Sequence, residues 1–435
     1  MKRFAAIATL LLASGSDWPQ FLGPERNGIY SGPPIGIQWS EGGPRRLWEK
    51  KIGQGFAGPA VVGNRLVLFH RVGNHEVVEA LDVVTGAPLW RHEYQTAYRD
   101  DFGFDEGPRS VPVVAEGAVF TFGAEGVLSA VALETGKPLW SVATAERFKV
   151  PKNFFGAAGS PLVMDGRVLL NVGGAEAGLA AFDAKSGELL WTATKDEASY
   201  SSPTAATLGG ERLALFYTRS GLEIVDPEKG TVKHQLPWRS RSRASVNAAV
   251  PLVVGDVVFL SASYGAGAAA HRLGPSGLTK LWSSDEALSS HYATAVHRDQ
   301  VLYGFHGRQE YGQSFRAVEL LTGKVLWSEE DFGAGTVTLA ADKLFLLRES
   351  GELAVAEASP RGFRVLARAR LLSGTVRAYP ALADGVIYLR NEKTLAAFDL
   401  RVPSSALVPR GPTPAARPFV GAQARRARSA RAGCG

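Results

Sequence analysis

The sequence contains a single cysteine among its 435 residues, Cys434, close to the C-terminus. No intramolecular disulfide can form, so the fold must be stabilised by its apolar core. Long apolar stretches are scarce as well. The run at residues 4–12 is too short to span a bilayer.

This apolar run follows Lys2 and Arg3 and precedes the small residues Ala13, Ser14 and Gly15, an order typical of a cleaved secretory signal peptide. We therefore expect residues 1–15 to be a signal peptide. The mature protein is expected to be exported and soluble, in the periplasm or outside the cell, without a membrane span. No cysteine follows the run, so no lipid anchor is expected at the mature N-terminus.

The net charge of +6 comes from the two ends of the chain. Residues 401–435 hold seven arginines and no acid, and without these and the two basic residues of the signal the body carries −3. A nucleic-acid partner is therefore not expected. The tail is rich in Arg, Pro and Ala and is predicted to be disordered. Its segment Leu-Val-Pro-Arg-Gly at 407–411 looks like a thrombin linker, so a native and a vector-derived origin both stay open.

Metal and catalytic motifs are also scarce. The eight histidines show no His-x-x-x-His spacing and have no cysteine partners, so no zinc site is expected. No Gly-x-Ser-x-Gly nucleophile motif is present either.

Tryptophan, in contrast, recurs with a period of 42–51 residues. The repeat positions are Trp48, Trp90, Trp140, Trp191, Trp238, Trp282 and Trp327, with Leu372 in the eighth place. Between them, short apolar runs alternate with Asp-Gly, Ser-Gly and Thr-Gly pairs, which are typical of strands joined by tight hairpins. Each unit is therefore predicted to be a four-stranded antiparallel meander.

A single meander cannot bury both of its faces, whereas a ring of them can. Eight inner-strand openings can be counted, at Pro59, Pro112, Pro161, Pro203, Pro251, Thr294, Val337 and Pro380. The last unit lacks a fourth strand, which residues 37–50 can supply. We predict an all-β fold, an eight-bladed β-propeller of four-stranded antiparallel blades over residues 16–400, closed by pairing of the N- and C-terminal strands. Two unrelated β-sandwiches would not account for the tryptophan period.

The repeats resemble a known family. Residues 80–90 (Ala-Leu-Asp-Val-Val-Thr-Gly-Ala-Pro-Leu-Trp) and 181–191 are similar to the PQQ-like, quinoprotein-type β-propeller repeat, and Asp-Trp-Pro-Gln-Phe at 17–21 resembles the start of exported members. The resemblance implies one of two branches: PQQ-dependent dehydrogenases, or the non-enzymatic scaffold propeller of the outer-membrane β-barrel assembly machine.

The resemblance also implies what a dehydrogenase would need, namely an adjacent-cysteine disulfide against PQQ and a calcium site with carboxylate and amide oxygens. This sequence has no cysteine pair, and residues 16–400 contain no Asn-Asp pair of that kind. We therefore expect a monomeric, non-enzymatic scaffold that binds an envelope protein, peptide or polymer. No cofactor is expected. A small PQQ- and calcium-dependent dehydrogenase acting on an alcohol or sugar, and a carbohydrate-binding propeller, remain as alternatives.

The mouth of the central channel is the first candidate site. Three residues before each strand opening lie Phe56, Arg109, Ala158, Tyr200, Ala248, His291, Ala334 and Arg377. Two arginines, a histidine and two aromatic residues near one axis would suit an anionic or peptide ligand. The alternative is a set of solvated loop tips.

Two further candidates lie in loops. The insertion at 94–108 carries Tyr98, Phe102 and Phe104 beside three aspartates, which favours a protein interface, with a calcium loop as the alternative. A basic cluster follows Trp238 and comprises Arg239, Arg241 and Arg243; it could meet an acidic partner or phosphate, or simply be solvated.

Overall fold

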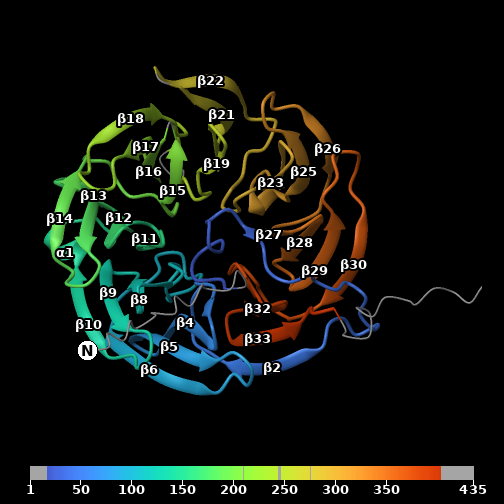
Figure 1. The fold of residues 1–435 in the computed structure, drawn as a ribbon, viewed down its shortest axis with the longest axis horizontal. Coiled ribbons are helices and arrows are strands. Elements are labelled where there is room, and N and C mark those ends of the chain that lie inside the picture. Colours follow the sequence, from blue (N-terminus) through green and yellow to red (C-terminus); the bar gives the residue numbers. More distant parts are fainter. Residues whose placement is uncertain (1–16, 209, 243–245, 275, 403–435) are drawn as a thin grey trace, which may run out of the picture. The chain divides into compact units, whose positions relative to one another are not determined.

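Eight four-stranded antiparallel sheets follow one another around a ring, as Figure 1 shows. This computed structural model describes residues 17–402 except 209, 243–245 and 275. The predicted eight-bladed β-propeller is confirmed. The predicted signal peptide, the segment at 407–411 and Cys434 lie outside the described residues. The chain divides into residues 1–401 and 402–435, and everything below concerns the described part of the first unit.

Each blade runs from an inner strand at the channel to an outer strand at the rim. The strands of the first four blades are, in order, β3 (Ala60–Val62), β4 (Arg65–Val72), β5 (His75–Asp82) and β6 (Pro88–Gln95); β7 (Val113–Ala115), β8 (Ala118–Phe122), β9 (Val127–Ala132) and β10 (Pro138–Ala143); β11 (Leu162–Met164), β12 (Arg167–Gly174), β13 (Ala177–Asp183) and β14 (Leu189–Ala193); β15 (Thr204–Leu208), β16 (Glu211–Tyr217), β17 (Gly221–Val225) and β18 (Val232–Pro237).

The other four blades have the same order, and the last takes its outer strand from the N-terminal region. Their strands are β19 (Leu252–Val254), β20 (Val257–Ala262), β21 (Gly267–Gly274) and β22 (Gly277–Ser284); β23 (Val296–Arg298), β24 (Val301–His306), β25 (Ser314–Glu319) and β26 (Val325–Glu329); β27 (Gly335–Ala340), β28 (Lys343–Arg348), β29 (Glu352–Glu357) and β30 (Val365–Arg370); β31 (Ala381–Ala383), β32 (Val386–Arg390), β33 (Thr394–Asp399) and β2 (Arg46–Lys51). Two short helices, α1 (Thr144–Arg147) and η1 (Gln309–Tyr311), lie in connections.

The Asp-x-x-Thr-Gly pattern builds the hairpin before the outer strand. In the first blade the Asp82 carboxylate accepts hydrogen bonds from the backbone N–H groups of Val84 and Thr85, at 3.1 and 2.9 Å. A hydrogen bond from the Thr85 hydroxyl, together with these two backbone bonds, lowers the pKa of Asp82. Gly86 follows with φ +70°, a conformation that glycine adopts without strain.

The repeat tryptophans join neighbouring blades. The indole N–H of Trp90 donates to the carbonyl of Leu133 in the next blade at 2.7 Å. The ring lies on Gly136, where a Cβ atom would stand 2.4 Å from Trp90 Cε3. The same arrangement recurs at four further pairs: Trp48 with Gly86, Trp140 with Gly187, Trp191 with Gly230, and Trp282 with Gly323.

Two positions of the predicted tryptophan repeat are wrong. In the fourth blade His234 pairs with Ile224 at the place where Trp90 pairs with Ala80, and Trp238 lies beyond the end of β18. In the seventh blade Ala367 of β30 occupies this position, not Leu372. Counting residues along the chain misassigned both positions because the connections differ in length, whereas strand register identifies them.

The ring is closed by β2, which pairs antiparallel with β33 and places Trp48 opposite Ala397. The closing strand is shorter than the predicted segment 37–50. Because the last blade thereby gains its fourth strand, the two ends of the described chain meet within one sheet and leave no incomplete blade in the ring.

Residues 17–30 cross the centre of the ring, a feature that was not predicted from the sequence (Figure 1). Trp18 and Val61 exchange two backbone hydrogen bonds of 2.8 Å, and the Pro19 carbonyl accepts the N–H of Val114 at 2.8 Å. The segment then forms β1 (Ile29–Tyr30), which pairs parallel with the inner strand β27. These contacts tie it to the first, second and seventh blades.

Arg26 fixes the middle of this central segment. Its guanidinium is fully buried and donates to the carbonyls of Pro203 at 2.7 Å and Ser160 at 3.4 Å, and also to that of Pro161. These carbonyls belong to the starts of the inner strands of the third and fourth blades. The segment is therefore a plug that binds inner strands on opposite sides of the channel.

Candidate functional site

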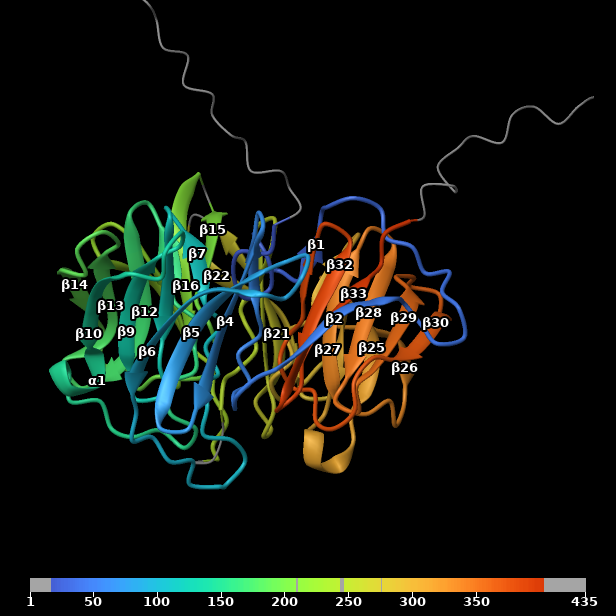
Figure 2. The ribbon, with the colours of Figure 1, turned by 90° about the horizontal axis from the view of Figure 1, so that it is seen from below.

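The connections between an outer strand and the next inner strand meet on one face, the lower one in Figure 2, where η1 also projects. At the axis they enclose a cavity of about 450 Å³, the mouth cavity. Its wall includes seven of the eight residues predicted at the channel mouth: Phe56, Arg109, Ala158, Tyr200, Ala248, His291 and Arg377. Ala334 is not part of the wall.

One wall of the mouth cavity is built from phenylalanine rings and arginines. The Arg109 guanidinium lies 5.4 Å from the centroids of both Phe56 and Phe155. That of Arg377 lies 5.7 Å from Phe56 and from Phe104. These cation–π contacts hold the two side chains against the aromatic surface.

The arginines of the cavity are paired with carboxylates. Arg377 Nε lies 3.0 Å from Glu349 Oε1, and Arg109 Nη2 lies 3.6 Å from Asp100 Oδ1. On the far wall the lining residue Glu310 pairs with Arg308, which does not itself line the cavity, at 2.8 Å. An anionic ligand would therefore have to compete with carboxylates that are already in place.

The far wall is polar and uncharged at its centre. Tyr264 and His291 share a hydrogen bond of 3.1 Å, and burial lowers the pKa of His291 so that the neutral imidazole is favoured. Tyr292 donates to Glu349 at 2.6 Å and Gln309 donates to the same carboxylate at 3.0 Å. Together with Arg377, these two donors hold Glu349 in place.

The floor of the cavity comes from the plug. Phe21 lines it and meets Tyr379 edge to face, with ring centroids 4.9 Å apart. The Tyr379 hydroxyl in turn accepts the N–H of Thr294 at 2.6 Å. The plug therefore sets the depth of the cavity as well as closing the channel.

Arg71 anchors the insertion that carries the predicted interface aromatics. It is fully buried and donates to the carbonyls of Tyr98 at 2.7 Å and Glu106 at 3.2 Å, near the two ends of the loop. Between them Phe102 and Phe104 are 53% and 56% exposed. Phe102 contacts Phe104 and Phe154, with centroids 6.2 and 6.0 Å apart. We call Phe102, Phe104 and Phe154 the aromatic crown.

Tyr98 was predicted to belong to the interface with Phe102 and Phe104, but it does not lie at the surface. Only 3% of Tyr98 is exposed, because its ring lies beneath the loop and against Gly156. Burial raises its pKa to about 12. Its hydroxyl group has no hydrogen-bond partner among the described residues.

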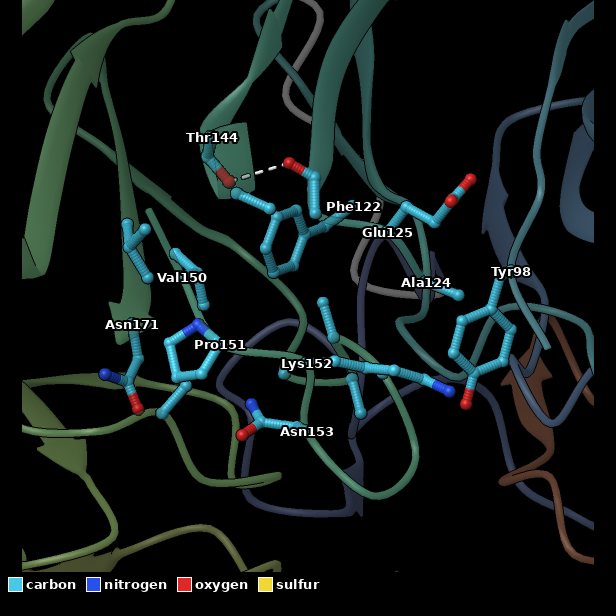
Figure 3. Close-up of a pocket in the computed structure, with 18 of the residues that line it drawn as sticks. Tyr98, Phe122, Ala124, Glu125, Thr144, Val150, Pro151, Lys152, Asn153 and Asn171 are labelled. Carbon is cyan, nitrogen blue, oxygen red and sulfur yellow. Dashed lines mark hydrogen bonds between the residues drawn. The ribbon is translucent and has the colours of Figure 1, made fainter. Parts of the chain in front are cut away.

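A second hollow of about 370 Å³, the side cavity, lies between the second and third blades (Figure 3). Its lining includes Tyr98, Phe122, Val150, Lys152, Asn153 and Asn171. The Lys152 ammonium lies 5.8 Å from the centroid of the Tyr98 ring. This cavity was not predicted from the sequence.

The predicted basic cluster lies apart from both cavities. Arg239 and Arg241 are exposed and line neither one, and Arg239 donates to the neighbouring Ser240 carbonyl at 3.3 Å. Arg243 lies outside the described residues.

Five of the eight phenylalanines and tyrosines that line the mouth cavity were not predicted from the sequence. The residues missed are Phe21, Phe155, Tyr264, Tyr292 and Tyr379. Tyr264 follows β20 in a hairpin on the same face, and Phe21 belongs to the plug. A search that also included the hairpins between the second and third strands would have found Tyr264.

Neither a membrane-spanning helix nor a metal cluster is found in the described structure. In the part of the chain that the structure describes, no helix has the length and apolar character needed to cross a bilayer. Nor do the described residues bring together three or more His, Cys, Asp or Glu side chains in a way that could hold a metal ion.

The four-stranded blades, docked on one another by repeat tryptophans and closed into a ring by β2, define a PQQ-like β-propeller. More narrowly, the chain belongs to the family described as outer membrane protein assembly factor BamB, whose model matches residues 74–327.

Comparison with solved structures gives the same fold. BamB from Moraxella catarrhalis matches with a TM-score of 0.61 over 82% of this chain and 97% of that chain, at 14% identity. The quinohemoprotein alcohol dehydrogenase from Comamonas testosteroni matches with a TM-score of 0.50 over 90% of this chain and 82% of that one, also at 14% identity. At such identities the likeness concerns the fold alone.

Among curated proteins, the quinohemoprotein alcohol dehydrogenase ADH-IIG of Pseudomonas putida is 28% identical over 163 residues, which are 36% of this chain. The matched region spans about a fifth of that relative's length, 21%. ADH IIB of the same species is 32% identical over 120 residues, or 17% of its length.

Proposed function

We propose that this protein is a non-enzymatic, exported scaffold that binds a protein partner through the face bearing the mouth cavity and the aromatic crown. The observation that carries this proposal is the crown itself, because a soluble protein rarely leaves a cluster of three phenylalanines exposed unless a partner covers them. The family membership supports it, since the model carries the description of an assembly factor.

The rigidity of the face is consistent with a binding surface. The loop that carries two crown residues is tied at both ends by the buried Arg71. A preorganised surface loses less conformational entropy when a partner docks than a mobile loop does. The propeller ring beneath it supplies the fixed base.

The quinoprotein relatives make a PQQ-dependent dehydrogenase the second candidate, so the cavity must be tested against the needs of that cofactor. A calcium ion takes six to eight oxygen ligands. Glu310 lines the mouth cavity and accepts a bond from Arg308. Glu349 does not line it and already accepts bonds from three lining residues, Arg377, Tyr292 and Gln309. The residues of the mouth cavity therefore do not fit a PQQ–calcium pair.

The test uses p-benzoylphenylalanine, a photo-crosslinking residue, in place of Phe104. Illumination in an envelope extract of the producing cells should give a discrete protein adduct that unlabelled protein competes away. The matched control carries the crosslinker in place of Val84, which is 71% exposed on the turn between β5 and β6, on the opposite face.

Equal adducts from both positions, or none from position 104, would contradict the proposal. A parallel titration with PQQ and calcium, followed by tryptophan fluorescence and dye reduction on alcohols and sugars, tests the second candidate. Saturable quenching with turnover would replace the scaffold by the dehydrogenase.

A further inference from the structure

The mouth cavity and the side cavity share a wall. Residues 153–160 run between them, Ala158 lines both, and Asn153 and Phe155 line the side and the mouth cavity respectively. The crown residue Phe154 lies in the same segment and is 39% exposed. The two cavities therefore lie on either side of a single chain segment, residues 153–160, which carries the crown residue Phe154.

Most of the charges around both cavities have a charged partner among the described residues. The exception is Glu125 at the side cavity, which accepts hydrogen bonds from the Thr96 hydroxyl at 2.7 Å and the Ala97 N–H at 2.9 Å and forms no ion pair among the described residues. Arg109 and Arg377 have Asp100 and Glu349, and at the side cavity Lys152 is paired with Asp101. A ligand with a charged group would have to compete with these internal partners and would lose hydration energy on entry. A neutral ligand with apolar groups avoids this cost and gains the aromatic surface.

Tyr98 gives a second, independent indication of a ligand. It lines the side cavity, is 3% exposed, and its hydroxyl lacks a hydrogen-bond partner in the described structure. An unpaired buried donor destabilises the folded state, so such groups normally have a partner. A carbonyl group of a ligand in the side cavity would provide one.

From this geometry we infer that the two cavities are paired subsites for one extended, uncharged polypeptide segment. An aromatic side chain enters the mouth cavity, the backbone crosses the crown, and a second apolar side chain enters the side cavity. Alternate side chains of an extended chain project to the same side about 7 Å apart, so one segment can place two side chains on either side of the wall that the cavities share. This inference rests on the proposed scaffold function and specifies its partner.

Binding is measured by fluorescence anisotropy with fluorescein-labelled synthetic peptides. The two-anchor probe is Gly-Ser-Phe-Gly-Phe-Ser-Gly, and the one-anchor probe replaces its second Phe with Ala. Further probes replace both Ser with Glu or with Lys. The two-anchor probe should bind at least about tenfold more tightly than the one-anchor probe, and neither charged probe should bind more tightly than the neutral one.

Cavity-filling variants separate the two subsites. Ala248→Leu, in the mouth cavity, should weaken both probes about tenfold or more. Ala145→Leu, in the side cavity, should weaken only the two-anchor probe. Val84→Ala, on the opposite face, should change neither. If a filled variant fails to fold by circular dichroism, Phe104→Ala replaces Ala248→Leu and Lys152→Ala replaces Ala145→Leu.

Three outcomes would overturn the inference: equal affinity for both probes, tighter binding of an acidic or basic probe, or binding of maltohexaose in place of the peptides. The last outcome would indicate a glycan site. A crosslink from position 104 that persists while the peptides fail would reject this partner chemistry and leave the scaffold proposal standing. If neither the crosslink from position 104 nor peptide binding is observed, the scaffold proposal and this inference are both rejected.

Discussion

Gly136 should be intolerant of any side chain because Trp90 lies on it. In Gly136→Ala the new Cβ atom would stand 2.4 Å from the ring at a residue with φ +68°. The left-handed conformation alone costs about 1–2 kcal/mol, and displacing the packed ring adds about 1–3 kcal/mol. Trp90→Ala should by itself lower the free energy of unfolding by about 2–4 kcal/mol, since the ring is half-buried and its hydrogen bond is lost.

The double variant Trp90→Ala/Gly136→Ala tests whether the cost of a side chain at position 136 comes from the docked Trp90 ring or from the backbone conformation alone. With Ala at position 90 the new methyl group has room, so the second substitution should cost only the backbone strain, and the two changes should be non-additive by about 1–3 kcal/mol. Gly117→Ala is the control, because Gly117 has φ +76° in the same blade and no atom lies within 4 Å of the place its Cβ would take. Urea denaturation measures all of them. Additivity within about 0.5 kcal/mol, or an equal cost at position 117, would refute the docking explanation.

Other predictions concern buried charges. Arg71→Ala should lower the free energy of unfolding by about 2–4 kcal/mol and expose residues 98–106 to proteolysis, because two loop carbonyls lose their hydrogen-bond donor. Unchanged cleavage of that loop would contradict the anchoring role of Arg71. Arg26→Met should cost about 3–5 kcal/mol in a thermal or urea melt, because it leaves inner-strand carbonyls unpaired, and a neutral effect would show that the plug does not hold the ring. Burial raises the pKa of Glu223 to about 7 from an ordinary 4.5, so the folded state retains a proton that the unfolded chain has lost, and stability should fall as pH rises from about 5 to 8. Glu223→Gln should flatten this dependence, and an unchanged slope would count against it.

The propeller could be predicted because its signals are local and repeated. Turn residues such as Asp82 and Gly86 determine hairpins within a few positions, and the missing fourth strand of the last blade pointed to β2. The mouth residues were found for the same reason, since one offset from each strand opening places them on one axis.

What could not be predicted depends on contacts between distant segments. Nothing near Arg26 in the sequence indicates the carbonyls of Ser160 and Pro203, and the pairing of β1 with β27 joins segments far apart in the chain. The burial of Tyr98 depends on Arg71, Gly156 and the loop above it. His234 replaces a tryptophan without any change in the surrounding apolar pattern, so only strand register reveals it.

The closure by β2 has a consequence for biogenesis. This strand is made before every other strand of the eight blades, yet its partner β33 is the last of them to be made. Until then the final blade is incomplete, and two strand edges stay open to wrong partners or to other copies of the chain. Joining segments so far apart also carries a loop-closure entropy that local hairpins avoid. Chains that lose their last strand should therefore fail late, as open rings prone to association, and not as unfolded polypeptide.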